Sequence, residues 1–311
     1  MRERKQHAHS HKHSDKTGKT KEFNIYKILT IVLAIAFVIA LAVLIRNRYV
    51  ADQGEYLFSE IRDDTKGSHT SPATSPGDTG ETEETQTQPT ETETDGSETE
   101  MTEPPLDIEI PEKTLDWDAL RKKYKNQDIY AWIYIPGTAI DYPVLQHPTD
   151  DSHYLNYNLN GSKGYPGCIY TEKINSKNFT DFNTIMYGHN MRNGTMFASL
   201  HYFETQSFFD SYPYIFVYRE DQVLVYEVFA AYKRDDKHIL YAYDFETETG
   251  RQEYLDEVLS EEEIARHRET ELTTNSHILT LSTCIRGEAT KRYLVQAKLL
   301  NEKVLHELGN E

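Results

Sequence analysis

Residues 276–292 read SHILTLSTCIRGEATKR, and this stretch is the most informative part of the sequence for the fold. The β-branched and apolar residues of 277–284 predict a strand that ends at Cys284, and residues 292–300 predict a second strand. The seven residues between them include a glycine, so we expect the two strands to form an antiparallel hairpin. In that hairpin Cys284 lies opposite Arg292, and cross-strand partners project from the same face. The stretch therefore predicts a thiol and a guanidinium on one surface.

Alternation along the two predicted strands separates an apolar face from a partly polar one. We expect the apolar face to lie in the core and the polar face to border a groove. The apolar face carries Leu279, Leu281, Tyr293, Val295 and Ala297, and the polar face carries Thr280, Ser282, Cys284, Arg292 and Gln296.

The composition allows one good-sized domain with appendages, because the chain has 311 residues of which 38% are hydrophobic. The net charge of −18 argues against a nucleic-acid partner. Residues 67–112 hold 13 acidic side chains and no Lys or Arg, so most of the net negative charge belongs to this one segment and says little about substrates.

The N-terminal part is a basic tail followed by a membrane segment. Residues 1–24 are polar and basic, and their four alternating histidines are more simply a solvated tail than a metal site. Ile28–Ile45 gives 18 residues without a charge, which predicts a transmembrane signal anchor over 25–47. Basic residues follow the run directly, unlike in a cleavable signal peptide. They are denser before it, so we expect the N-terminus in the cytoplasm and the rest of the chain outside the membrane.

Three further segments follow the anchor. Residues 48–66 form a short juxtamembrane segment. Residues 67–112 are rich in Thr, Glu, Ser and Pro and have almost no large apolar side chain, which predicts a disordered stalk. Residues 113–311 form the folded domain.

The folded domain is predicted to be mainly β. Trp117, Leu120 and Tyr124 at helical spacing behind Asp116 indicate an opening helix. Eight short strands between turn residues favour a closed or nearly closed eight-stranded barrel. The exception is 246–267, which has a helical pattern and a capping-box spacing at Ser260 and Glu263, and we expect this helical insertion to form one wall of the groove. The predicted strands are 131–135, 140–145, 167–171, 184–187, 214–218, 223–232, 277–284 and 292–300.

The two cysteines have different surroundings. Cys284 lies at a strand end beside hydroxyl residues and opposite an arginine, which indicates a reactive thiol. Cys168 lies within an apolar strand and is interpreted as a buried structural residue. A disulfide between them would silence the nucleophile, so we expect both to be free.

A cysteine nucleophile needs a proton-transfer partner and an electrostatic one. Among the histidines of the folded region, His189 follows the predicted strand 184–187 and a glycine, and opens a loop. Functional side chains concentrate on such strand-end loops. Arg286 competes with Arg292 for the electrostatic role, but Arg286 falls inside the hairpin loop, where its direction is unspecified.

Several segments of the chain resemble one known enzyme family. The run Thr280-Leu281-Ser282-Thr283-Cys284 followed by Arg292 resembles the active-site strand pair of sortases, particularly those of class B. The run 187–191, YGHNM, is similar to the histidine loop of that family, and the segments 132–138 and 140–144 resemble its opening strands. The resemblance covers residues 114–300 in consistent order. The chain departs from the family in the long acidic insertion before the domain and in Tyr130, where a small residue is common.

The resemblance implies a membrane-anchored cysteine transpeptidase on the outer face of a Gram-positive cell, with a sortase-type barrel. It implies that Cys284 attacks a C-terminal sorting motif of a surface protein after Thr and forms a thioester acyl-enzyme. The acyl group would then pass to an amine of peptidoglycan or of its lipid-linked precursor. His189 would exchange the protons, and Arg292 would stabilise the oxyanion.

The resemblance also implies substrate-binding residues. Ser282, Asp151 and Leu155 would line the groove, and Tyr254 and Leu255 of the helical insertion would form its opposite wall, although core packing is an open alternative for these residues. No cofactor is implied, and no convincing metal site is present in the domain, so we expect metal-independent activity.

Two other functions stay open. Residues 282–286 faintly resemble the cysteine motif of L,D-transpeptidases, which expects a glycine before the cysteine where this chain has Thr283, and whose arginine would be Arg286. The non-enzymatic alternative is a stalked surface-binding barrel in which Cys284 is only a buried thiol.

Overall fold

The computed structural model describes residues 17–65, 108–260 and 266–302. By its internal contacts the chain divides into two compact units, Met1–Asp52 and Gln53–Glu311. The long helix α1, Thr17–Thr65, runs through the boundary between the two units. The predicted stalk, 67–112, lies outside the described residues except for its last five positions.

Within the first unit, α1 contains the apolar run of the sequence. Among the described residues, Ile25–Tyr49 is the one helical segment long and apolar enough to cross a membrane. Its 25 residues would extend roughly 37 Å at the α-helical rise per residue. The side chains of this segment are exposed, so the segment is a candidate membrane span or signal sequence.

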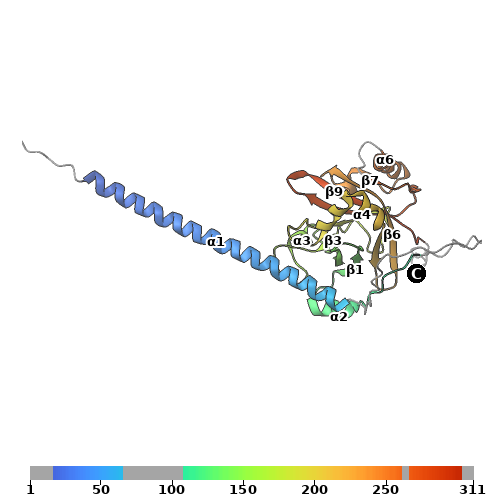
Figure 1. The fold of residues 1–311 in the computed structure, drawn as a ribbon, viewed down its shortest axis with the longest axis horizontal. Coiled ribbons are helices and arrows are strands. Elements are labelled where there is room, and N and C mark those ends of the chain that lie inside the picture. The colour runs from blue at the N-terminus through green and yellow to red at the C-terminus, as the bar shows by residue number, and fades with distance from the viewer. Residues whose placement is uncertain (1–16, 66–107, 261–265, 303–311) are drawn as a thin grey trace, which may run out of the picture. The chain divides into compact units, whose positions relative to one another are not determined.

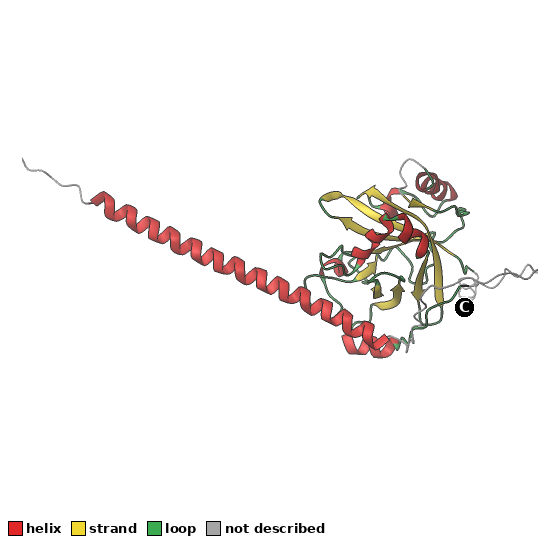
Figure 2. Ribbon diagram, in the orientation of Figure 1, coloured by secondary structure: helices red, strands yellow, loops and turns green. Residues whose placement is uncertain are grey.

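The second unit is a β-barrel, as predicted (Figures 1 and 2). In the described residues, eight strands follow one another in the order β5-β1-β2-β3-β4-β8-β9-β6, and β5 pairs with β6 to close the circle. Two neighbouring pairs, β2–β3 and β4–β8, are parallel, and the other pairs are antiparallel. The strands are β1 (Ile129–Tyr134), β2 (Asp141–Leu145), β3 (Ile169–Thr171), β4 (Asn183–Tyr187), β5 (Tyr214–Tyr218), β6 (Val223–Asp235), β8 (Ile278–Ile285) and β9 (Glu288–Leu299).

Short helices connect the strands. The predicted opening helix is α2, Trp117–Tyr124, and Asp116 caps it by accepting a hydrogen bond from the Ala119 amide at 2.9 Å. The others are α3 (His153–Asn156), the 3₁₀ helix η1 (Phe197–Glu204), α4 (Gln206–Ser211), α5 (Ile239–Ala242) and α6 (Glu248–Val258).

The helical prediction for 246–267 is right for α6 and wrong at its C-terminal end. Arg266–His267 is the short strand β7, which pairs with Ala230 and Ala231 of β6. Thr247 provides the side-chain cap of α6 by accepting from the Gly250 amide at 3.1 Å, and the predicted capping box at Ser260 and Glu263 extends into residues 261–265, outside the described residues. A glycine is required at 250 because a Cβ there would lie 2.1 Å from the Asp244 carbonyl oxygen. The close approach of Gly250 to Asp244 and the pairing of β7 with β6 are contacts that the helical pattern of 246–267 does not indicate.

The hairpin between β8 and β9 is tighter than predicted. Ile285 pairs with Glu288, so the turn contains only Arg286 and Gly287, and Gly287 has a φ of +84°. Cys284 nevertheless pairs with Arg292, because the register shifts between Cys284 and Ile285. The predicted cross-strand pair is confirmed, and the extra residues of β9 are taken up in a bulge.

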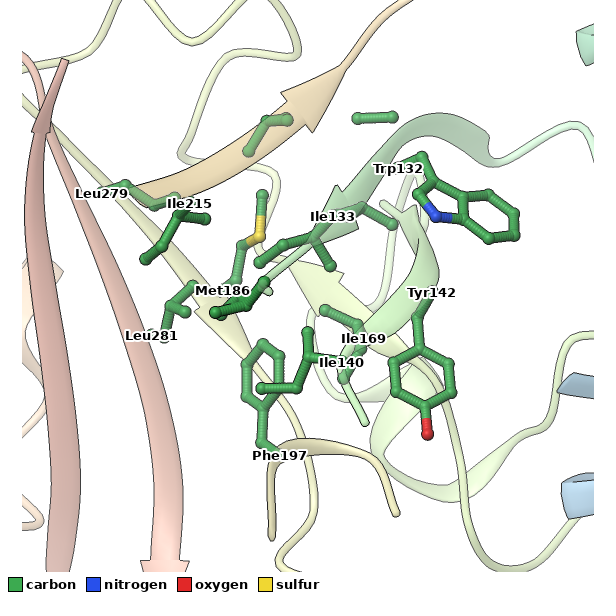
Figure 3. Packing of buried hydrophobic residues seen from close by; sticks show 14 of the residues in the cluster. Trp132, Ile133, Ile140, Tyr142, Ile169, Met186, Phe197, Ile215, Leu279 and Leu281 are labelled. Atoms are coloured by element: carbon green, nitrogen blue, oxygen red, sulfur yellow. The ribbon is translucent and has the colours of Figure 1, made fainter. Parts of the chain in front are cut away.

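Apolar side chains fill the barrel interior. Ile133, Met186, Ile215, Leu279 and Leu281 come from four different strands and gather together (Figure 3). A second buried cluster covers part of the outer surface, where α6 packs on β6, β8 and β9 (Figure 1). The two clusters fix both faces of β8, whose end carries Cys284.

Candidate functional site

Strand β8 is the centre of the site because it lies between β4 and β9. On one side, Tyr187 of β4 pairs in parallel with Ser282, and the Gly188 amide continues the ladder to the Ser282 carbonyl at 3.2 Å. Two residues further on, this register brings His189 alongside Cys284. On the other side, Cys284 pairs with Arg292. Since neighbouring strands lie about 4.8 Å apart, the topology places an imidazole and a guanidinium on opposite flanks of the thiol.

A cleft with a volume of about 330 Å³ opens over these strands. The three residues predicted to carry the chemistry all line it, and its floor comes from β4, β8 and β9. The lining includes Leu155, Tyr170, Ile185, Tyr187, Gly188, His189, residues 234–239, Ser282, Thr283, Cys284, Arg292 and Leu294.

Cys284 and Cys168 are both free, as expected. Cys284 is exposed in the cleft, whereas Cys168 is 1% exposed in the core, where burial raises the pKa of its thiol well above the ordinary value. The neighbouring Thr283 hydroxyl donates to the Gly188 carbonyl at 2.8 Å and ties the end of β8 to the histidine loop. The exposed thiol is the one that can meet a substrate.

His189 is held by the loop that follows β4. Its Nε2 lies 2.8 Å from the Leu155 carbonyl oxygen, which can only accept, so Nε2 carries a proton and Nδ1 is the nitrogen left for proton exchange. The Tyr165 ring meets the imidazole edge-on, with ring centroids 4.9 Å apart. Burial lowers the pKa of His189, and the hydrogen bond to Leu155 opposes this shift.

A glycine is required before His189 for a steric reason. A Cβ at Gly188 would lie 2.5 Å from Ile169 Cδ1 and 2.7 Å from the Phe197 ring. The chain therefore approaches the core closely at this point, and the following imidazole reaches the cleft.

Arg292 is partly exposed, with 31% of its side chain accessible. Its Nη1 donates to the Ala289 and Lys291 carbonyls at 3.0 and 2.9 Å, and its Nη2 lies 3.8 Å from Asp236 Oδ2. These contacts hold the guanidinium at the cleft with positive charge available to an oxyanion. Arg286 is exposed in the turn and is not among the residues that line the cleft.

The predicted substrate-binding residues fall into two groups. Ser282 and Leu155 line the cleft. Asp151 does not line it, and its carboxylate accepts from the Lys173 amide at 2.8 Å and lies 3.4 Å from Lys173 Nζ.

Tyr254 and Leu255 do not form a wall of the cleft, contrary to the expectation. They are 0% and 1% exposed in the cluster beneath α6, and the Tyr254 hydroxyl is hydrogen-bonded by the Gln296 amide. Because α6 turns these side chains inward onto β8 and β9, core packing is their structural role.

The opposite wall is the segment 234–239, which was not predicted from the sequence. It begins at the end of β6 and leads into α5. Arg234 fixes it, because its guanidinium donates to Glu257 of α6 at 2.8 Å and to the Lys237 carbonyl at 2.9 Å. His238 Nε2 donates to the Glu172 carboxylate at 2.9 Å, which anchors the wall to the end of β3. The available signal was the run of six charged or titratable residues, 233–238, at a strand end.

Among the described residues, no group of three or more His, Cys, Asp or Glu side chains is arranged to hold a metal ion. The side chains that line the cleft include a thiol, an imidazole and a guanidinium.

Comparisons with known proteins agree with this geometry. A family model described as the Sortase domain matches residues 133–300. The chain is 34% identical to sortase B of Staphylococcus aureus over 177 residues. This match covers 56% of this chain and 71% of that protein. A curated sortase B of Listeria monocytogenes is also 34% identical, over 190 residues, which is 60% of this chain and 75% of that protein.

Solved structures of class B sortases have the same fold. The crystal structure of Clostridium perfringens sortase B superposes with a TM-score of 0.53 at 34% identity, covering 59% of this chain and 99% of that one. Because the chain matches the sortase family, it is neither an L,D-transpeptidase nor a non-enzymatic surface-binding barrel. The chain belongs to the sortase family, as a class B sortase-type cysteine transpeptidase.

Proposed function

We propose that this transpeptidase cleaves a C-terminal sorting motif after Thr and joins the new carboxyl group to an amine of peptidoglycan or of its lipid-linked precursor. The observation that carries the proposal is the exposed Cys284 at the end of β8, between His189 on one flank and Arg292 on the other. A solved Staphylococcus aureus sortase B–substrate complex, at 34% identity and a TM-score of 0.52, supports a substrate-binding role for this domain.

In the first half-reaction the Cys284 thiolate attacks the Thr carbonyl carbon. The carbonyl electrons move onto oxygen, and the Arg292 guanidinium donates hydrogen bonds to this oxyanion. The oxyanion collapses, the C–N bond breaks, and the protonated His189 donates a proton to the departing amine. The product is a thioester between Cys284 and Thr.

In the second half-reaction an amine attacks the thioester carbonyl. His189, now neutral, accepts a proton from the attacking nitrogen, and the C–S bond breaks to restore the thiolate. The lowered pKa of His189 favours the neutral form that this step requires and disfavours the protonated form that the first half-reaction requires. Nδ1 is the exchanging nitrogen in both directions, because Nε2–H donates to Leu155.

The location that we propose for the enzyme is the outer face of the cell membrane. Ile25–Tyr49 would serve as a single membrane span, with the basic residues 1–24 in the cytoplasm by the positive-inside rule. Residues 113–311 would then act outside, where surface proteins and cell-wall amines are accessible. This orientation would place the basic tail inside the cell and the stalk and catalytic domain outside it.

The test uses the full chain in detergent micelles with a library of sorting-motif peptides and a small amine. Mass spectrometry should detect transpeptidation products and an acyl adduct on Cys284, and the Cys284→Ala variant should give neither. Turnover that persists in Cys284→Ala, or peptides that remain intact with wild-type enzyme across the library, would contradict the proposal.

A further inference from the structure

The carbonyl of Cys284 is bound by a side chain where the backbone ladder ends. The last ladder bond between the β4 edge and β8 runs from the Gly188 amide to the Ser282 carbonyl. The next carbonyl on this edge, that of Cys284, accepts from the Asn190 side-chain amide at 2.9 Å. Asn190 directly follows His189, so one loop presents the imidazole and also holds the backbone of the thiol residue.

A histidine outside the proposed triad contacts the same carbonyl. His201 of η1 places Nε2 at 2.9 Å from Asn190 Nδ2 and at 3.2 Å from the Cys284 oxygen. Its Nδ1 lies 2.7 Å from Glu204 Oε1, and its ring stacks on Tyr293 with centroids 4.9 Å apart. The loop after β4, helix η1 and strand β9 therefore meet at the end of β8.

The hydrogen-bonding capacity of these groups orders them into a chain. The Glu204 carboxylate accepts, so His201 Nδ1 donates to it, and the Nε2 of the neutral ring is an acceptor. The two amide hydrogens of Asn190 then go to His201 Nε2 and to the Cys284 carbonyl. If the Asn190 amide were flipped, its oxygen would face both acceptors and both hydrogen bonds would be lost. His201 thus selects the amide orientation that binds Cys284.

We propose that Asn190 and His201 are positioning residues for catalysis, forming with Glu204 a relay that holds the Cys284 carbonyl and thereby aligns the thiol with His189. This inference rests on the proposed role of Cys284 as the nucleophile. The relay acts on the backbone of Cys284, whereas the substrate meets its side chain.

Asn190→Asp is the sharpest variant, because it keeps the shape of the side chain and replaces the amide donor with an acceptor facing a carbonyl. We expect kcat to fall about 10- to 100-fold at an unchanged KM, the range for a small misplacement of a reacting group. His201→Ala should lower kcat in the same way. His201→Gln should restore much of it, because a glutamine amide supplies both an acceptor for Asn190 and a donor for Glu204.

The matched control is Asn193→Asp on the same loop. Asn193 Oδ1 only accepts, from the Thr195 amide at 3.3 Å and its hydroxyl at 2.8 Å, and a carboxylate can do the same. This variant should have wild-type kcat and KM.

A spectroscopic readout separates positioning from loss of fold. The chain contains two cysteines, so labelling the full chain in micelles with [1-¹³C]cysteine gives two carbonyl signals, and Cys168 is an internal reference. Asn190→Asp and His201→Ala should move the Cys284 signal and leave the Cys168 signal in place, while Asn193→Asp should move neither. An unmoved Cys284 signal together with a kcat within about twofold of wild type in Asn190→Asp would overturn the relay. If the wild-type enzyme gives no acyl adduct, the proposed function is wrong, and the Cys284 signal still tests the relay.

Discussion

Replacing Arg292 by alanine tests its proposed role in stabilising the oxyanion. Arg292 pairs with Cys284 across the hairpin, and hydrogen bonds to Ala289 and Lys291 hold its guanidinium. Removing one preorganised oxyanion donor costs about 100- to 1,000-fold in kcat, or about 3 to 4 kcal/mol. Because 31% of the side chain is accessible, water screens the charge, and we expect a loss of about 100-fold, at the low end of that range.

The assay measures kcat and KM for cleavage of a quenched sorting-motif peptide in the presence of an amine. Arg292→Lys should fall between wild type and Arg292→Ala, because an ammonium keeps the charge but not the two-pronged donor geometry of the guanidinium. Arg286→Ala is the matched control, since Arg286 is exposed in the turn, and its kcat should be close to wild type. If Arg286→Ala abolishes cleavage and Arg292→Ala does not, the oxyanion assignment is wrong.

Three further predictions follow from the same contacts. A small alkylating reagent at neutral pH should modify Cys284 and spare the other, buried cysteine, as peptide mass spectrometry would reveal. Tyr165→Ala should raise the pKa of His189, because the tyrosine ring contributes to the burial that lowers it, and an NMR titration of the imidazole would show a midpoint at higher pH. Glu257→Gln should destabilise the domain by about 1 to 2 kcal/mol in urea denaturation, because it leaves the buried Arg234 with only the more distant and more exposed carboxylate of Asp235, at 3.7 Å.

Each of these has a control or a contradicting result. Equal alkylation of both cysteines in the native chain would show that Cys284 has no special exposure. A His189 midpoint that moves to lower pH in Tyr165→Ala would remove burial as the cause. Glu288→Gln breaks an ion pair with Lys233 in which both side chains are about half exposed, and it should leave the urea midpoint close to that of wild type.

Burial of His189 also links stability to pH. Its lowered pKa means that the unfolded chain binds the proton more readily than the folded one. The favourable contribution is therefore complete above the ordinary histidine pKa of about 6.5 and is lost as the pH falls below it. Tyr165→Ala should weaken this dependence.

Local pattern was enough for much of the fold. Alternation and turn residues predicted the eight barrel strands, and helical spacing behind Asp116 predicted α2. The apolar run predicted the helical segment Ile25–Tyr49 in the same way. These features depend on residues close together in the chain, so periodicity and composition report them directly. The pair Cys284 and Arg292 is also of this kind, because one hairpin contains both.

Only the tertiary structure decided how the cleft is assembled. His189 reaches Cys284 through the parallel pairing of β4 with β8, which are separated by about ninety residues in the sequence, and no local pattern encodes that pairing. The same is true of the wall at 234–239, which Glu257 of α6 braces, and of Tyr254, which packing turns into the core. The amino-acid sequence determined by itself which side chains stand at strand ends, because that information is local. Contacts between distant strands decided which of them share a cleft.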